Sequence, residues 1–221
     1  SIKPQLEAEG YKVKLVEFTD YVTPNLALGD GSIDVNCFQH KPYLDSFAKS
    51  HNLDLTPITQ VPTGPMGLYS GKKQKLDQVA DGSTVAIPND PTNQARALVM
   101  LQDLGWLTLK AGTDPLKASE FDVDKNPHQI KLIPLEAAQL PRSREDVDFS
   151  VINGNYAASS GIPFKTGLFL ERSYNFINWV VVRSADKDKP FVKDVTAAYN
   201  SAAFRAYAKK RFADYKFPQG W

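Results

Sequence analysis

Segments with strand-like and helix-like patterns alternate from the start of the chain, and this alternation restricts the fold more than any other feature. Apolar residues alternate over Tyr11–Phe18, and Ile33–Phe38 is a second strand-like segment. Leu26–Leu28 and Lys41–His51 are predicted helices, the second with Pro42 in its first turn. Together with a short helical start, this order favours a parallel sheet covered by helices, so we expect an α/β fold.

The same alternation begins again at Thr84, which predicts a second lobe. Thr84–Pro88 is a predicted strand, and Ala95–Leu104 is a predicted helix with Asp90 as its N-cap and Pro91 as its first residue. Ile130–Leu135 is a further predicted strand, and Phe149–Asn153 another. A chain of 221 residues is long enough to bury two small cores.

The last part of the chain is predicted to return to the first lobe. Asn175–Val182 is strongly strand-like, and Pro190–Phe212 is predicted as one long helix. The predicted boundaries are residues 1–82 for the first part of lobe 1, 83–173 for lobe 2 and 174–221 for the return. The two crossings between lobes are then expected near Gly82–Thr84 and near Glu171–Asn175.

The charge balance argues against two classes of partner. Lys plus Arg number 26 and Asp plus Glu number 25, so no field of one sign is available to hold a nucleic acid or an anionic membrane surface. The apolar run Phe176–Val182 is interrupted by Asn178 and is far shorter than a membrane span, which needs roughly 18–20 residues. We therefore expect no nucleic-acid partner and no membrane-spanning segment in this sequence.

Patterns that carry catalytic or metal chemistry are missing from the sequence. HExxH, GxSxG, GxGxxG after a strand and paired-cysteine motifs are absent, and Gly71-Lys72-Lys73 fails as a phosphate loop at two positions. The single cysteine, Cys37, excludes an intramolecular disulfide, and we expect it to be a buried bystander. No catalytic residue, metal ligand or cofactor is predicted.

Polar and aromatic residues gather where predicted strands end and helices begin, which is where open α/β sheets bind ligands. Four segments show this, namely residues 18–25, 36–44, 88–96 and 151–157. Within them, Arg96 stands one turn after Asn93, so both share a helix face near a helix start that suits a carboxylate. Asn153 and Asn178 end or interrupt apolar strands, where an amide without a partner is costly.

Five motifs in these regions resemble those of the NlpA-type methionine-binding lipoproteins of bacterial ABC importers. They are FTDYxxPN, FQHKPYL, PNDPTNxxR, LEAxQLPRS and VINxxYA, in that order. The resemblance spans about Tyr11 to Trp221. It implies a two-lobed periplasmic-binding-protein fold, type II-like, with a ligand cleft between the lobes that closes on binding, and no enzymatic turnover.

The resemblance also implies a set of ligand-binding residues in two groups. The side-chain pocket falls on aromatic or imidazole rings, and the amino-acid clamp on amides and a guanidinium; the residues are Tyr21, Phe38, His40, Tyr43, Asn93, Arg96, Asn153 and Asn178. A polarizable thioether suits an aromatic surround, with sulfur–aromatic contacts of roughly 0.3–1.5 kcal/mol each. Asparagine carbonyl oxygens are suited to accept from an ammonium.

The residues by themselves leave other interpretations open. Without the resemblance, Phe38 and Tyr43 are typical core aromatics and Asn93 is a typical turn residue. Arg96 would then be a solvated helix arginine, and His40 an ordinary hydrogen-bonded histidine.

The resemblance implies an extracytoplasmic protein that captures L- or D-methionine for ABC permease subunits. A methionine-containing dipeptide or another amino acid is the alternative ligand, and an enzyme or an effector-sensing domain is the alternative of another class. The family pattern starts with a strand before the first helix, so that strand, the signal segment and the lipid-anchor cysteine are expected outside the given chain. The expected location is the periplasm or the outer face of the cytoplasmic membrane, through a lipid anchor.

Overall fold

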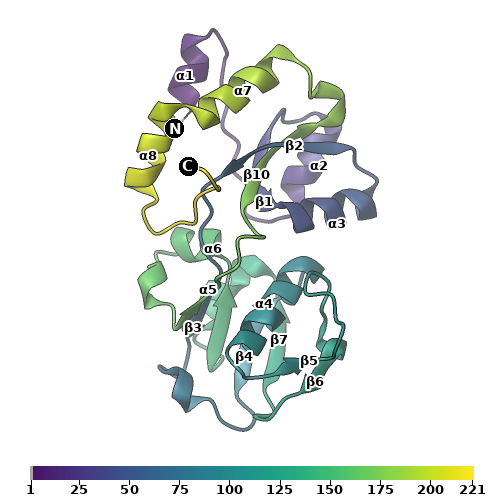
Figure 1. Ribbon diagram of the computed structural model, residues 1–221, viewed down its shortest axis with the longest axis vertical. Coiled ribbons are helices and arrows are strands. Elements are labelled where there is room, and N and C mark those ends of the chain that lie inside the picture. Colours follow the sequence, from purple (N-terminus) through teal and green to yellow (C-terminus); the bar gives the residue numbers. More distant parts are fainter. Residues whose placement is uncertain (1) are drawn as a thin grey trace. The chain divides into compact units, whose positions relative to one another are not determined.

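The computed structural model describes residues 2–221, which form two compact units (Figure 1). Unit 1 combines the chain up to Thr63 with Tyr174–Trp221, and unit 2 is Gly64–Ser173. The predicted first boundary at residue 82 is therefore wrong. The reason is that β3 (Gly67–Ser70) pairs with β8 (Phe149–Ile152) and β9 (Phe169–Leu170), both strands of unit 2.

Unit 1 contains a three-stranded sheet in the order β1-β10-β2. The strands are β1 (Asn36–His40), β2 (Leu55–Val61) and β10 (Asn178–Arg183). β10 is antiparallel to both neighbours, so β1 and β2 run in the same direction on either side of it. The expectation of a parallel sheet is wrong for unit 1, because the returning strand inserts between the two earlier ones in the opposite direction.

Helices cover both faces of the unit 1 sheet, as successive side chains of β10 show. Val180 packs in one core with residues of α1 (Lys3–Ala8) and α7 (Pro190–Asn200). Val181 packs in another core with Leu28 of α2 (Thr23–Asp30) and Leu44 of α3 (Lys41–His51). Figure 1 shows these two pairs of helices on opposite sides of β10.

Tyr11–Phe18 forms no strand, contrary to the sequence prediction. A strand needs a neighbouring backbone for its hydrogen bonds, and no strand in residues 2–221 pairs with this segment. Tyr11 and Val13 pack against the core of β10 and α7, whereas Leu15 and Val16 are exposed. The alternating pattern here places one set of side chains on a core without joining a sheet.

The predicted long helix at Pro190–Phe212 is two helices, α7 and α8 (Ala202–Arg211). Ser201 between them has an extended backbone, with φ −64° and ψ 149°, and its side chain accepts a hydrogen bond from Phe204 N. Serine is a strong N-cap residue, so Ser201 ends one helix and begins the next.

Unit 2 contains a five-stranded sheet in the order β7-β4-β8-β3-β9. β4 (Thr84–Pro88) runs parallel to both β7 (Lys131–Leu135) and β8, whereas β3 is antiparallel to its neighbours β8 and β9. Short elements complete the unit: η1 (Leu76–Gln78), β5 (Thr108–Leu109), η2 (Glu120–Asp122), β6 (Val123–Lys125), η3 (Ala137–Gln139) and η4 (Phe164–Thr166).

The core of unit 2 lies between this sheet and α4 (Pro91–Asp103). Leu98 and Leu101 of α4 pack with Val85, Ile87 and Phe149 of the sheet, all fully buried. The short helices α5 (Leu140–Ser143) and α6 (Gly154–Ser159) follow β7 and β8 along the chain. The N-cap of α4 is Asp90, as the sequence predicts, and its position just after β4 places the start of α4 at the strand's carboxyl end.

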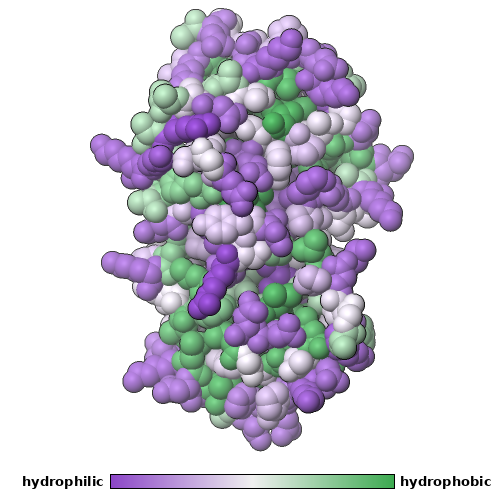
Figure 2. All heavy atoms as spheres, in the orientation of Figure 1, coloured by the Kyte–Doolittle hydropathy of each residue, from purple (hydrophilic) through white to green (hydrophobic). Residues whose placement is uncertain are grey.

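Hydrophilic residues are spread over the face seen in Figure 2, with small apolar groups between them. Within residues 2–221, no helix has both the length and the apolar character required to cross a membrane.

Candidate functional site

The four predicted pocket rings form one cluster in unit 1. Ring centroids are 6.0 Å apart for Tyr21 and Phe38, 5.9 Å for Tyr21 and Tyr43, and 6.1 Å for Phe38 and Tyr43. The imidazole of His40 lies edge-on to Tyr43 at 6.2 Å. The Tyr43 hydroxyl donates to Tyr21 O at 2.7 Å, which ties the loop before α2 to the start of α3. The rings therefore pack as one connected cluster, in which Tyr43 and His40 are buried.

His40 has a structural task in addition to its place in the cluster. It is the N-cap of α3, and its Nδ1 accepts a hydrogen bond from Tyr43 N at 3.2 Å. This contact assigns the neutral ring's hydrogen to Nε2. His40 is 4% exposed, so this hydrogen bond satisfies one nitrogen of a buried ring.

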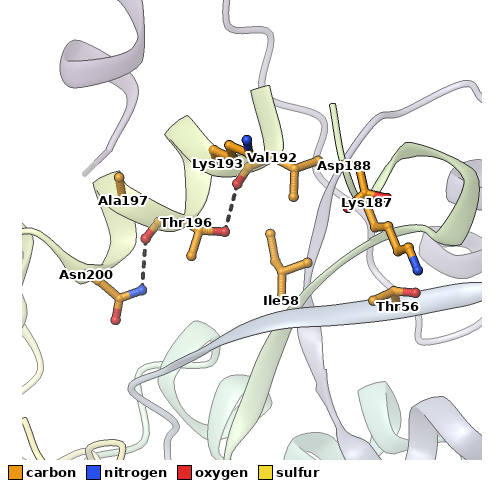
Figure 3. Close-up of a pocket in the computed structure, with 9 residues that line it drawn as sticks. All are labelled: Thr56, Ile58, Lys187, Asp188, Val192, Lys193, Thr196, Ala197 and Asn200. Carbon is orange, nitrogen blue, oxygen red and sulfur yellow. Dashed lines mark hydrogen bonds between the residues drawn. The ribbon is translucent and has the colours of Figure 1, made fainter. Parts of the chain in front are cut away.

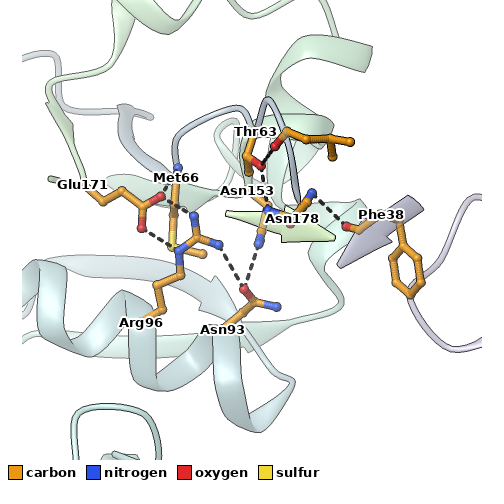
Figure 4. Close-up of polar contacts among 9 residues, drawn as sticks. Phe38, Thr63, Met66, Asn93, Arg96, Asn153, Glu171 and Asn178 are labelled. Carbon is orange, nitrogen blue, oxygen red and sulfur yellow. Dashed lines mark hydrogen bonds and ion pairs between the residues drawn. The ribbon is translucent and has the colours of Figure 1, made fainter. Parts of the chain in front are cut away.

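Asn178 begins β10 and is anchored from two directions (Figure 4). Its Nδ2 donates to Phe38 O at 3.0 Å, and its backbone N donates to Thr63 Oγ1 at 2.8 Å. Because the amide nitrogen faces Phe38 O, the carbonyl oxygen of the same amide is turned away from it. Asn178 thus presents its Oδ1 as a hydrogen-bond acceptor at the start of β10, which pairs with β1.

Buried amides behind the aromatic cluster connect the first two motifs. Asn25 Nδ2 donates to Gln39 Oε1 at 2.7 Å, and Gln39 Nε2 donates to Asn25 Oδ1 at 2.6 Å. Asn36 Nδ2 donates to Asn25 Oδ1 at 2.9 Å. Asp20 accepts from Val22 N at 2.7 Å in the turn that carries the first ring of the cluster. These contacts hold α2 against β1, and the sequence prediction did not include them.

In unit 2, the predicted clamp begins with Asn93 at the start of α4, next to the N-cap residue Asp90. Asp90 Oδ1 accepts from Asn93 N at 3.0 Å, and Asn93 Nδ2 donates to both carboxylate oxygens at 3.0 Å. Burial raises the pKa of Asp90, while hydrogen bonds from Asn93 and Thr92 and the charge of Arg96 oppose that rise. Asn93 is 2% exposed, so it is a member of a buried network and not merely a turn residue.

Arg96 and Glu171 form a buried ion pair (Figure 4). Arg96 Nε donates to Glu171 Oε2 at 2.6 Å, and Arg96 Nη2 donates to Glu171 Oε1. Glu171 Oε1 also accepts from Met66 N at 3.0 Å. The side chains of Arg96 and Glu171 are 5% and 4% exposed, so the interpretation of Arg96 as a solvated helix arginine is wrong.

Two edges of the Arg96 guanidinium thus face different groups. Its Nη1 is 3.4 Å from Asn93 Oδ1, a long contact compared with those to Glu171. Glu171 was missed as a site residue because the pair joins positions 75 residues apart, which sequence spacing does not reveal. The signal that was available is the isolated acidic residue after the apolar run of β9.

Asn153 completes the network in unit 2. Its Nδ2 donates to Asn93 Oδ1 at 3.1 Å, but its Oδ1 is buried and accepts no hydrogen bond from residues 2–221. The next residue, Gly154, has no room for a side chain, because a Cβ there would lie 2.3 Å from the backbone of Gly64. The loop that carries Asn153 is therefore packed directly on the loop before β3.

The family comparison identifies the chain's relatives. The NlpA lipoprotein family profile matches residues 1–220. This chain belongs to that family. Among NlpA relatives, the D-methionine-binding lipoprotein MetQ of Salmonella typhi is 43% identical over 210 residues, which cover 93% of this chain and 77% of the relative.

Solved structures agree with this membership in the NlpA family. A nutrient-binding protein from Burkholderia cenocepacia bound to methionine is 42% identical with a TM-score of 0.90, over 96% of this chain and 89% of that one. A lipoprotein from Ruminococcus gnavus is 35% identical with a TM-score of 0.93, over 96% and 90% of the two chains. The fold is the two-lobed binding-protein fold of these relatives, as the sequence resemblance predicts.

A hollow in unit 1 shares no residue with the predicted site (Figure 3). It has a volume of about 640 Å³ and lies between β2 and α7 of unit 1. Thr196 Oγ1 donates to Val192 O at 2.7 Å, and Asn200 Nδ2 donates to Thr196 O at 2.8 Å. These two polar side chains of the hollow are thus already hydrogen-bonded to backbone carbonyl groups of α7.

No group of three or more His, Cys, Asp or Glu side chains able to hold a metal ion occurs in residues 2–221. Cys37 is exposed and not buried as expected, although its thiol is hydrogen-bonded with Tyr199. Desolvation by nearby atoms still raises the pKa of the Cys37 thiol to about 11, so the thiol is protonated at neutral pH.

Proposed function

We propose that this protein captures methionine outside the cytoplasmic membrane and delivers it to an ABC permease. The observation that carries the proposal is a pair of preorganised surfaces in a chain of the NlpA family. Unit 1 has the aromatic cluster, and unit 2 has a buried polar network in which Asn153 Oδ1 receives no hydrogen bond from residues 2–221. The methionine-bound relative from Burkholderia cenocepacia supports this choice of ligand.

The aromatic cluster of Tyr21, Phe38, His40 and Tyr43 is assigned to the ligand's side chain. An unbranched thioether fills irregular apolar space and makes favourable contacts with ring edges, at roughly 0.3–1.5 kcal/mol each. Conversion of the sulfur to a sulfoxide adds a strong acceptor that aromatic faces do not satisfy, a mismatch of roughly 1–3 kcal/mol. A hydrogen bond from His40 Nε2 to the sulfoxide oxygen would narrow this difference. The cluster therefore predicts discrimination between methionine and its sulfoxide.

The amino-acid end of the ligand is assigned to amide groups and a guanidinium. Asn153 Oδ1 and Asn178 Oδ1 accept from the ammonium, since both amides have their nitrogens bonded elsewhere. The carboxylate is assigned to Arg96 through Nη1, because Glu171 takes the Nε and Nη2 edge. Asn93 supports both assignments by holding Arg96 and Asn153 together.

Calorimetric titration tests the ligand assignment. Protein freed of co-purified ligand is titrated with L-methionine, D-methionine, a glycine–methionine dipeptide, norleucine and methionine sulfoxide. We expect methionine to bind at least about tenfold more tightly than its sulfoxide, and norleucine to have an intermediate affinity. Equal affinities for methionine, norleucine and the sulfoxide would show that the rings do not line the ligand's side chain.

The proposal also assigns a role without turnover. The residues placed on the ligand are amides, rings and a guanidinium, and none is a base or nucleophile with an activating partner. Methionine incubated with the protein should be recovered unchanged. A product that accumulates in proportion to protein concentration would contradict a binding role.

We place the protein on the outer side of the cytoplasmic membrane through a lipid anchor, in keeping with the lipoprotein family to which it belongs. Its partner there is an ABC permease that receives the ligand. Fractionation of cells that express the full-length precursor, with metabolic labelling by a fatty acid, tests the anchor. A labelled protein in the membrane fraction is expected, and an unlabelled one would refute the anchor while leaving the ligand assignment intact.

A further inference from the structure

The buried network of unit 2 has a defined hydrogen-bond polarity, and Asp90 stands at its acceptor-only end. Both oxygens of the Asp90 carboxylate accept from Asn93 Nδ2 at 3.0 Å. A carboxylate offers only acceptors, so the Asn93 amide must turn its nitrogen toward Asp90 and its oxygen away. Asn93 Oδ1 then faces Asn153 Nδ2 at 3.1 Å.

The same polarity continues into Asn153. Because Asn153 Nδ2 donates to Asn93 Oδ1, the carbonyl oxygen of Asn153 lies at the opposite end of that amide. This oxygen is one of the buried side-chain atoms that have no hydrogen-bond partner within residues 2–221, and its residue is 4% exposed. A buried acceptor without a donor is costly, so the arrangement suits a ligand that brings a donor of its own.

We infer that Asp90 is a positioning residue that determines ligand specificity: through Asn93, it fixes Asn153 as an acceptor and so selects ligands with a protonated amine. This inference rests on the proposed function, since it concerns how the same site recognises the ammonium of an amino acid. Arg96 Nη1 also faces Asn93 Oδ1, but at 3.4 Å, and is the weaker of the two restraints on that amide. Asp90 acts from two side chains away and does not touch the ligand.

The test compares methionine with its desamino analogue, methylsulfanylbutanoate, in calorimetric titrations of wild type and Asp90→Asn. Asparagine keeps the N-cap of α4 but places a donor against Asn93 Nδ2, which destabilises the native orientation of that amide. The preference for methionine over the analogue should fall about tenfold, because the ammonium loses a charge-assisted hydrogen bond. A merely structural role for Asp90 would weaken both ligands equally and leave their ratio unchanged.

A double variant gives the rescue. In Asp90→Asn with Asn153→Asp, the carboxylate moves from position 90 to position 153. A carboxylate at position 153 offers only acceptors to the ligand's ammonium, whichever way the Asn93 amide is turned. We expect the preference for methionine to return to within about threefold of wild type. Failure of this rescue, with both variants folded, would overturn the inference.

Controls keep the result interpretable. Asp122→Asn is the matched control, since Asp122 accepts from Ser119 N and Ser119 Oγ at 2.8 Å in another cap of unit 2. It should leave the preference unchanged, and an equal fall in the control would count against the inference.

If Asp90→Asn does not fold, Asp90→Ser retains a cap and removes the carboxylate, with the same expected fall in the preference for methionine. Wild-type protein that does not bind methionine would refute the proposed function itself, whereas an unchanged ratio in a binding-competent variant refutes only the role of Asp90.

Discussion

Substitution of Glu171 by leucine should destabilise the protein strongly, because it leaves the Arg96 guanidinium buried without its partner. The two side chains are 5% and 4% exposed, so solvent does not replace the lost contacts. Loss of one partner of a buried ion pair costs about 3–5 kcal/mol. Each kcal/mol lowers the melting temperature of a chain of this size by roughly 2–4 °C, so the expected shift is about 6–20 °C.

The assay is thermal unfolding followed by circular dichroism for Glu171→Leu, Arg96→Leu and the double variant. Removal of both charges replaces the pair with apolar groups, so the double variant should be more stable than Glu171→Leu alone. Asp45→Ala is the matched control, since the Lys41–Asp45 pair is 51% and 58% exposed and should contribute about 0–1 kcal/mol. A melting temperature for Glu171→Leu within about 2 °C of wild type would refute the reasoning.

Three further outcomes are expected. Gly154→Ala should lower the free energy of unfolding by about 1–3 kcal/mol in urea titrations and weaken methionine binding, because its Cβ would meet the Gly64 backbone; unchanged values for both would contradict the packing argument. The pKa of Asp186 is lowered, chiefly by its hydrogen bond from Lys189, so its contribution to stability is present above the ordinary carboxyl pKa and is lost as the pH falls through the lowered value. Asp186→Asn should therefore be less stable than wild type at neutral pH, with the difference shrinking in strong acid. Because desolvation by nearby atoms raises the pKa of the Cys37 thiol from 9.0 to about 11, its alkylation by iodoacetamide at pH 8 should be about 100-fold slower than that of an ordinary thiol. A rate profile with a midpoint near pH 9 would refute this.

Local signals predicted the structure well where the chain itself supplies the partner. Asp90 before Pro91 was predicted as the N-cap of α4, and the structure confirms it through the bond to Asn93 N. Ser201 carried the same kind of signal, but the long apolar pattern around it hid the break between α7 and α8. Capping is a contact over three residues, so sequence alone is sufficient to find it.

Contacts between distant segments were beyond the reach of sequence patterns. Tyr11–Phe18 has the alternation of a strand, but strand formation depends on a neighbouring backbone that periodicity does not report. Sequence patterns placed Glu171 only near a crossing between the two predicted lobes, because nothing in its local sequence indicates that Arg96 is its partner. The motif resemblance selected residues such as Asn153, and the structure adds the direction in which that amide is held.

The central position of β10 in unit 1 determines the order in which the chain can fold as it is made. Asn178 donates to Thr63, 115 residues earlier, so the sheet of unit 1 waits until all of unit 2 has been synthesised. Gly64–Ser173 is continuous and contains a complete sheet of its own, which gives it the shorter loop closures. The half of the molecule that is synthesised first is therefore the half that finishes folding last, and until then β1 and β2 lack the strand that joins them.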